Sequence, residues 1–170
     1  VADQFGHARA TLVARLTPMV DEAYTQLAGR PVALDLYYEP VWRASGLHAA
    51  LADARALDVR RGVSTVGPHR DELVLSINGR ASRTHASQGE QRSLALALRL
   101  AAHRLVTERT GSAPVLVLDD VLSELDDQRA RALLAHLPTG QIVITSATNI
   151  PDGAQVNNVL HVRDGEIGES

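Results

Sequence analysis

The sequence predicts an α/β fold, and three features of its 170 residues indicate it. Residues 114–146 read in the order strand, helix, strand, with two continuous apolar runs around a helical segment. A long apolar segment after Ser87 has helical character, and residues 31–40 alternate as a strand does. Since 45% of the residues are hydrophobic, the chain can bury a core. We therefore expect a βαβ unit within an open α/β sheet.

The first sixty residues predict a helix, a strand and a second helix. Residues 3–28 carry apolar side chains at helical spacing, and this pattern stops before Pro31. Residues 31–40 are rich in β-forming residues and lie between two prolines, which favours a strand at a sheet edge. Residues 46–61 return to a helical period.

The middle of the chain predicts a hairpin followed by a capped helix. Residues 72–80 read as a strand that runs into an Asn-Gly turn, with a partner strand near residues 80–85. Ser87 stands where a helix N-cap would, and Glu90 follows three residues later, which is the capping-box pattern. The next helix would be about 20 residues, or about 30 Å, long. It is apolar on nearly every face over residues 94–102, so we expect it to be buried on several sides.

The remaining residues predict the βαβ unit and a final hairpin. Residues 113–120, APVLVLDD, hold the continuous apolar run that is typical of a central parallel strand, which is buried on both faces. Asp126 is expected to cap a helix that begins near Asp127. A second buried strand follows at residues 140–147, and a terminal hairpin is expected around Asp164-Gly165.

The composition excludes several classes of site. The chain holds seventeen arginines and no lysine, so it cannot contain the phosphate-loop motif GxxxxGK[ST]. It has no cysteine, which excludes disulfides and thiolate metal sites. Its opening residues resemble neither a signal peptide nor a membrane span, so we expect a cytoplasmic protein with no membrane partner. The start at Val1 rather than Met suggests a piece of a longer protein.

The net charge of −3 hides an asymmetry. Residues 55–109 hold ten arginines against five acidic residues, whereas residues 110–170 hold three against nine. The basic middle could follow a phosphate backbone and the acidic end could hold a metal, although single arginines are more often solvated or paired. With only 3% aromatic residues, we expect Trp42 and the Tyr37-Tyr38 pair to pack a sheet edge rather than stack on bases.

Two adjacent aspartates, Asp119 and Asp120, end the predicted central strand, where ligands bind in open α/β sheets. One carboxylate there can hold Mg²⁺, and the second can orient or deprotonate a water that attacks a phosphate. The alternative is an ordinary acidic helix start, which the dipeptide alone supports equally well. The segment Ser123-Glu-Leu-Asp126 that follows favours the functional interpretation.

The segment "SQGEQR" predicts an anion site at the start of the long helix. Ser87 offers a hydroxyl, Gly89 lets another molecule's phosphate approach the backbone, and the free N–H groups favour negative charge. Taken alone, the segment fits an ordinary capped helix better.

Together these segments resemble the ABC-type ATPases. Ser87–Gln91 resembles the signature motif of that superfamily, Val115–Asp120 its Walker B strand and Ser123–Asp126 its D-loop, in the same order. Within the superfamily, "GPHRDEL" (Gly67–Leu73), "SQGEQR" and "LDDVLSELD" followed by Arg129 are most similar to the RecF proteins of recombinational DNA repair. The resemblance is dense over residues 63–146 and sparse before them. It implies that residues 63–170 are the C-terminal part of an ATPase head and that residues 1–62 are a helical lobe or arm with one edge strand.

The resemblance implies a site for ATP and Mg²⁺ that is shared by two protomers. Asp119 would hold Mg²⁺, and Asp120 would be the catalytic carboxylate acting on the attacking water. A partner's γ-phosphate would be contacted by the signature motif, with Ser87 and Gly89 touching it and Gln88 and Glu90 supporting the turn. From the D-loop, Ser123 and Asp126 would lie at the dimer seam.

Two departures from the family pattern limit this inference. The phosphate loop and a recognisable Q-loop are absent, so ATP hydrolysis is expected only when an upstream half completes the site. The switch histidine that many ABC ATPases carry is also absent, and Thr145, Ser146 or Thr148 stands in its place as a candidate γ-phosphate sensor. His69 and Arg70 could contact DNA or the opposing lobe, or Arg70 could pair with the acidic end of its own sheet.

The implied partners are a second copy of the chain, gapped duplex DNA beside single strands, and RecO and RecR, which act with RecF to load RecA. Other functions stay open. The chain could be half of a transporter or SMC-like ATPase, a nucleotide-independent metal phosphatase or nuclease that uses Asp119, Asp120 and Asp126, or a scaffold that binds protein or DNA without catalysis.

Overall fold

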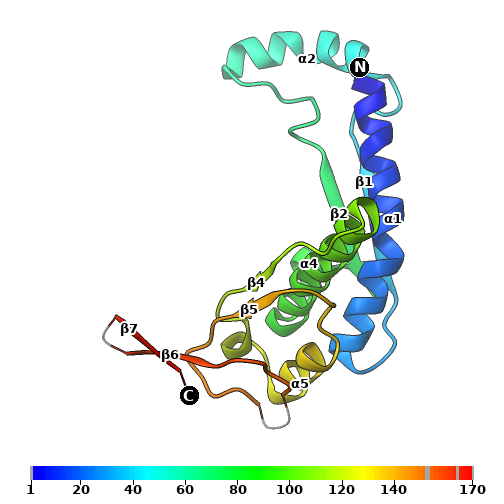
Figure 1. Cartoon of the computed structure of the whole chain (residues 1–170). Coiled ribbons are helices and arrows are strands. Elements are labelled where there is room, and N and C mark those ends of the chain that lie inside the picture. The colour runs from blue at the N-terminus through cyan, green and yellow to red at the C-terminus, as the bar shows by residue number, and fades with distance from the viewer. Residues whose placement is uncertain (1, 152–153, 164, 170) are drawn as a thin grey trace.

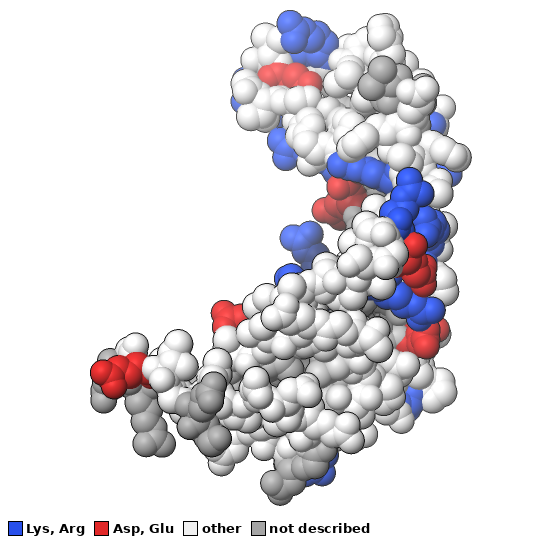
Figure 2. All heavy atoms as spheres, viewed as in Figure 1, with Lys and Arg blue, Asp and Glu red and all other residues white. Residues whose placement is uncertain are grey.

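The computed structural model describes residues 2–151, 154–163 and 165–169. A long N-terminal helix, α1 (Ala2–Ala28), runs between an upper arm and a lower lobe (Figure 1). The arm contains α2 (Leu47–Arg61), and the lobe contains α4 (Gln88–Thr110), α5 (Asp127–Ala135) and the parallel strands. With all atoms drawn, the outline is hollowed between the arm and the lobe (Figure 2).

Helix α1 (Ala2–Ala28) confirms the first predicted helix. Its second half packs against α4 (Gln88–Thr110) and α5 (Asp127–Ala135) in the main apolar core. Residues of α1 that lie in this core are at most 8% exposed, and they are Val20, Ala23, Tyr24 and Leu27. The core thus joins residues from both sides of position 62, and the division of the chain at that position stays a prediction.

An antiparallel sheet follows in the order β1-β2-β3, and it leads from the arm to the lobe. Strand β1 (Leu34–Glu39) lies at the sheet edge as expected, with alternate side chains buried. Strand β2 (Glu72–Ile77) pairs with it and turns at Asn78-Gly79. The partner strand expected over residues 80–85 is shorter: β3 spans only Arg80–Ala81, because the chain then coils into α3 (Ser82–His85).

Helix α2 (Leu47–Arg61) confirms the second predicted helix and forms the tip of the arm. None of its residues is buried. Its end is tied to the following loop by Asp58, whose carboxylate accepts hydrogen bonds from the backbone N–H of Thr65 at 2.9 Å and from its hydroxyl at 2.6 Å.

Helix α4 (Gln88–Thr110) is the long capped helix, and it is buried on one broad face. Leu94, Ala97 and Ala101 are at most 4% exposed there. The helix is apolar on nearly every face and is expected to be buried on several sides, but one strip opposite the buried face is exposed at Ala95 and Ala102. No described element covers that strip.

The predicted βαβ unit is present in the lobe. Strands β4 (Leu116–Leu118) and β5 (Ile142–Ile144) pair in parallel, and α5 (Asp127–Ala135) connects them after a short 3₁₀ helix, η1 (Val121–Glu124).

The expected burial of this parallel sheet on both faces is wrong. Leu116 and Leu118 are buried against the core, but Val117 and Val143 on the other face are 55% and 44% exposed. The physical reason is that α4 and α5 cover one face, while no described residues cover the other. The face of the lobe that Figure 2 shows is largely uncharged.

The last two strands, β6 (Leu160–Arg163) and β7 (Glu166–Glu169), form the expected antiparallel hairpin. Its predicted turn residue Asp164 lies outside the described residues. Among the described helices, none is both long and apolar enough to cross a membrane.

Candidate functional site

The first group of site residues lies where β4 and β5 end. Asp119 and Asp120 directly follow β4, and Thr145 directly follows β5, so the parallel pairing brings all three to one edge. The Thr145 hydroxyl donates a hydrogen bond to Asp119 Oδ1 and accepts one from the Asp120 backbone N–H at 3.0 Å. Thr145 therefore joins the two aspartates, and both of them are exposed.

Asp120 has an unusual backbone conformation. Its φ of 48° and ψ of 25° lie in the left-handed region, which few residues other than glycine adopt. Ser123 stabilises the turn by donating from its hydroxyl to the Asp120 carbonyl at 2.8 Å, and the Ala147 N–H lies 3.4 Å from Asp120 Oδ1. These contacts hold the carboxylate beyond the strand end, because the chain turns sharply there into η1.

The second group lies at the start of α4, where the predicted capping box is confirmed. The Ser87 hydroxyl accepts from the Glu90 N–H at 3.3 Å, and Glu90 Oε2 accepts from the Ser87 N–H at 2.8 Å and from its hydroxyl at 2.9 Å. Hydrogen bonds from the Ser87 backbone, and then from its hydroxyl, hold the pKa of Glu90 below its ordinary value. Gln88 is exposed beside them.

Gly89 lies against the Arg129 side chain of the same chain. A Cβ atom added at Gly89 would lie 3.1 Å from Arg129 Nη1. The same guanidinium donates to Asp126 Oδ2 at 2.6 Å, and Asp126 Oδ1 caps α5 by accepting from the Arg129 N–H at 2.9 Å. Asp126 thus acts as the predicted helix cap, and Arg129 bridges from it to the start of α4.

A second contact joins α4 to the segment after β4. Arg92 donates to the Glu124 carbonyl oxygen at 3.2 Å, and its Nε lies 3.6 Å from Glu124 Oε2. The start of α4, η1 and the start of α5 therefore form one connected framework.

Two candidate sensor residues form a local turn instead of joining the aspartates. The Ser146 hydroxyl lies 3.0 Å from both the carbonyl and the hydroxyl oxygen of Thr148, and it accepts from the Thr148 N–H at 3.1 Å. Of the three candidates, only Thr145 contacts Asp119 and Asp120.

His69 and Arg70 lie in the arm, away from both groups. Arg70 donates from Nε to the Ser64 carbonyl at 3.0 Å, and His69 Nε2 lies 3.4 Å from the same oxygen. Both side chains are exposed. The alternative in which Arg70 pairs with an acidic residue of its sheet is wrong, since no such ion pair exists within the described parts of the chain.

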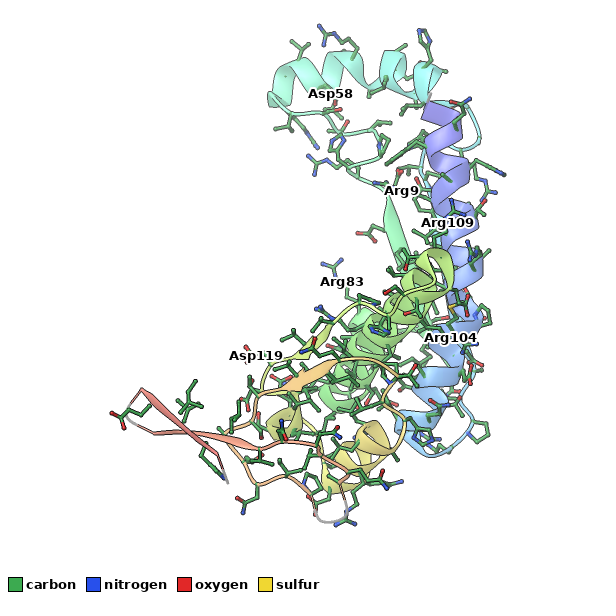
Figure 3. The ribbon with its side chains drawn as sticks, viewed as in Figure 1. Arg9, Asp58, Arg83, Arg104, Arg109 and Asp119 are labelled. Carbon is green, nitrogen blue, oxygen red and sulfur yellow. The ribbon has the colours of Figure 1, made fainter. Side chains whose placement is uncertain are left out.

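The neighbouring Asp71 is the buried centre of the arm. Its side chain is 0% exposed and accepts hydrogen bonds from the Tyr38 hydroxyl and, at 2.8 Å, from the Trp42 indole, while Arg9 Nη1 lies 3.5 Å away. Burial, followed by the hydrogen bond to Asp71, raises the pKa of Tyr38. Trp42 and Tyr38 pack inside as expected, although Tyr37 is 48% exposed. Figure 3 shows Arg9 in the arm and Asp119 at the lobe.

The exposed aspartates suit magnesium. Thr145 engages Oδ1 of Asp119, and no described residue bonds to the other oxygen, so that oxygen can take a cation. Within the described residues, no three His, Cys, Asp or Glu side chains group closely enough to hold a metal. Mg²⁺ is commonly held by only one or two carboxylates together with phosphate oxygens and water. Asp119, with Asp120 beside it, fits that pattern.

Sequence reasoning missed three connections. It did not find that Thr145 joins the two aspartates, that Arg129 reaches Gly89, or that Asp71 organises the arm. A threonine directly after the second parallel strand is a signal for the first, because parallel strand ends meet at one edge. The pairing of Arg129 with Gly89 has no local signal, since forty residues separate them.

Curated proteins named "DNA replication and repair protein RecF" are similar to this chain. The protein from Acidothermus cellulolyticus is 40% identical over 158 residues, which cover 85% of this chain and 42% of that protein. The protein from Streptomyces avermitilis is 45% identical over 154 residues, which cover 83% of this chain and 40% of that protein. The chain thus spans less than half the length of these relatives. No protein-family model matches it.

Solved structures of the recombination mediator protein RecF in the RecFOR pathway have the same fold. The one described with ATP matches with a TM-score of 0.77 and 26% identity over 99% of this chain and 47% of that chain. The one described with ATPrS matches with a TM-score of 0.74 and 28% identity over 95% of this chain and 45% of that chain. An Smc head bound to the C-winged helix domain of ScpA shares the fold, with a TM-score of 0.58 at 14% identity. In sequence and in fold, this chain resembles the C-terminal half of RecF, a DNA replication and repair protein with an ABC-type ATPase head.

Proposed function

We propose that this chain supplies part of a composite ATP site in a RecF-like DNA repair ATPase. The observation that carries the proposal is the connected framework in which two exposed groups are fixed. One group is the capped start of α4, and the other is the edge that bears Asp119 and Asp120. The first has the chemistry of an anion site and the second that of a cation site.

In this proposal, the strand edge acts on the nucleotide held by its own protomer. Asp119 would hold Mg²⁺, which would neutralise charge on the phosphate oxygens. Asp120 would orient the attacking water, and its carboxylate is exposed as that role requires. Thr145 would keep the Asp119 carboxylate and the Asp120 backbone in place, and it would report on the γ-phosphate only if its hydrogen bonds rearranged. Ser146 is the second candidate sensor.

The start of α4 acts on a partner's nucleotide. Ser87 and Gly89 would approach the γ-phosphate bound by a second copy of the chain, and Gln88 and Glu90 would support the turn. Ser123 and Asp126 would lie at the seam between the two copies. The helix dipole and free backbone N–H groups at this helix start favour a phosphate there.

The wider role is that of the RecF relatives. The ATP-dependent dimer would clamp gapped duplex DNA and, with RecO and RecR, promote loading of RecA, in the cytoplasm. Exposed His69 and Arg70 in the arm are candidate DNA contacts. Since such binding reads backbone charge, its affinity would fall steeply with salt concentration.

Two variants of the complete gene product test the composite site. We expect Asp119→Asn to impair Mg²⁺-dependent ATP binding and hydrolysis. We expect Ser87→Arg to leave ATP binding largely intact but to block ATP-dependent dimerisation, measured by light scattering after size-exclusion chromatography. Ser45→Arg, which changes an exposed serine of the arm, is the matched control and should dimerise normally.

The result that would overturn the proposal is equal ATP-dependent dimerisation by Ser87→Arg and the unchanged protein. Full Mg²⁺-dependent hydrolysis by Asp119→Asn would remove the role assigned to the strand edge.

A further inference from the structure

Gly89 does not need to be glycine for backbone reasons. It lies in the first turn of α4 and is not among the glycines with positive φ. A residue with a side chain could adopt this helical conformation without strain. The reason for glycine must therefore be the space around it.

That space is taken by Arg129 of the same chain. The position of a Cβ atom at Gly89 lies 3.1 Å from Arg129 Nη1, and 3.7 Å from Cζ. An alanine would have to push the guanidinium aside by a few tenths of an ångström.

The guanidinium is poorly able to move. Its Nη1 is bonded to Asp126 Oδ2 at 2.6 Å, and the side chain is only 29% exposed. Its Nε is buried and has no hydrogen-bond partner in the described structure. Leaving a buried N–H unpaired is unfavourable, so it is the bond from Nη1 to Asp126, and not Nε, that keeps the guanidinium in this position.

Arg129 also belongs to the helix that Asp126 caps. Asp126 receives both the backbone N–H and the Nη1 of Arg129, through its two oxygens. Moving the guanidinium would therefore disturb the Asp126 carboxylate. Gly89 and Asp126 are coupled through this one side chain.

We propose that Arg129 is a positioning residue that fixes the spacing between the start of α4 and Asp126, and that Gly89 is glycine to make room for it. The inference rests on the proposed function, in which the start of α4 faces a partner's nucleotide and Asp126 lies at the seam between the two copies. With their spacing fixed, Ser87 and Asp126 would meet the partner together. Loss of the arginine would weaken dimerisation without removing any group that binds nucleotide within the same protomer.

The test is a double-mutant cycle in the complete gene product, with Gly89→Ala, Arg129→Ala and both changes together. Two quantities are measured for each: the ATP affinity by fluorescent-nucleotide titration, and the protein concentration at half-dimerisation with ATP and Mg²⁺. We expect Arg129→Ala to keep its ATP affinity within about twofold and to raise the half-dimerisation concentration by roughly tenfold, the effect of one coupled contact. Arg131→Ala, an exposed neighbour on α5, is the matched control.

The cycle distinguishes two reasons for a glycine at position 89, which are room for Arg129 of the same chain and room for a partner's phosphate. If Gly89 makes room for Arg129, Gly89→Ala weakens dimerisation when Arg129 is present and adds little once it is alanine. An equal effect of Gly89→Ala in both backgrounds would overturn the inference and would mean that the glycine serves the partner's phosphate. Normal dimerisation of Arg129→Ala would also overturn it.

Ser87→Arg separates this failure from that of the proposed function. If Ser87→Arg blocks dimerisation while Arg129→Ala does not, only the role of Arg129 is wrong. If neither blocks it, the composite site itself is wrong. Should Arg129→Ala fail to fold, as judged by circular dichroism, Arg129→Gln replaces it in the same cycle because it keeps much of the stem and an amide donor.

Discussion

Two carboxylate centres in this chain are each held by side chains from other segments, but they have opposite exposure. In the arm, the Asp71 side chain is 0% exposed and its oxygens are bonded by side chains from two other segments. At the lobe, Asp119 and Asp120 are exposed, although a threonine from the next strand holds them. The buried carboxylate has no room for a ligand, so its contribution is to stability. The exposed pair keeps carboxylate oxygens free, so the fixed positions of these side chains serve to bind a ligand.

The comparison extends to the backbone around each centre. Gly6 lets α1 lie against the Trp42 ring, where an added Cβ would be 2.6 Å from Cη2. The arm centre is therefore closely packed on its apolar side as well. At the lobe, Asp120 adopts a left-handed conformation that a turn at the surface permits. Strain in an exposed turn is common at functional sites, whereas close packing is typical of structural ones.

The largest effect is expected when the buried centre is broken. Asp71→Ala leaves the Tyr38 hydroxyl and the Trp42 indole without their acceptor in a buried place. It also removes the carboxylate beside Arg9, which donates to the Pro68 carbonyl as well. We expect the free energy of unfolding to fall by about 3 kcal/mol, measured by urea denaturation. Asp53→Ala, at an exposed site on α2, is the control and should change it by less than about 0.5 kcal/mol. Similar losses for both variants would contradict the structural role of Asp71.

A smaller effect on stability is expected at the exposed centre. Thr145→Val keeps the shape of the side chain but removes the hydrogen bonds to Asp119 and to the Asp120 N–H. We expect a loss of about 1 kcal/mol in the free energy of unfolding, since the exposed aspartates can form hydrogen bonds with water instead. The affinity for Mg²⁺–ATP in the complete gene product should fall more than the stability. Thr145→Ser, which keeps the hydroxyl, should restore both, and a failure to do so would argue against the bridge.

The capping box predicts a pH dependence. Hydrogen bonds from Ser87 hold the pKa of Glu90 below its ordinary value of 4.5 in the folded chain. A depressed pKa means that the ionised group stabilises the fold above the unfolded-state value, and that this contribution is lost as the pH falls through the folded-state value. Glu90→Gln should cost about 0.5 kcal/mol at neutral pH, because glutamine also fits a capping box. The difference from the unchanged protein should vanish in acid, and a constant difference would contradict the assignment.

The smallest effect on stability is expected for Arg70. Its exposed side chain bonds only to a loop carbonyl, so Arg70→Ala should change the free energy of unfolding by less than about 0.5 kcal/mol. If Arg70 contacts a DNA phosphate, a plot of log DNA affinity against log salt concentration should be shallower for Arg70→Ala, by about one unit of slope. An unchanged slope would remove Arg70 from the DNA interface, and Arg43→Ala on the same arm serves as the comparison.

Several features of the fold and of the candidate site could be predicted from local sequence patterns. The capping box of Ser87 and Glu90, the Asp126 cap and the order of the βαβ unit are all confirmed, because spacing over a few residues determines them. The placement of Asp119 and Asp120 at a strand end follows from the same order. Their relation to ATP and to a partner stays a prediction.

The remaining features depend on contacts between distant segments or on what covers a surface. The run Val115–Leu118 predicts burial on both faces, yet its outer face is exposed because no described element packs on it. The short β3 could not be predicted from an Asn-Gly turn, which sets the start of pairing but not its length. Burial of Asp71 could not be predicted either, since its partners Tyr38 and Arg9 lie more than thirty residues away.

The central claim is that Ser87 of one copy and Asp119 of another complete one site, and a mixing experiment tests it most directly. Complete proteins carrying Ser87→Arg or Asp119→Asn are each expected to hydrolyse ATP poorly. In an equimolar mixture, each dimer that pairs the two variants would contain one intact site and only one obstructed signature motif, so hydrolysis well above that of either variant alone should return. A mixture no more active than its separate components would place both residues in the same protomer's site and contradict the account.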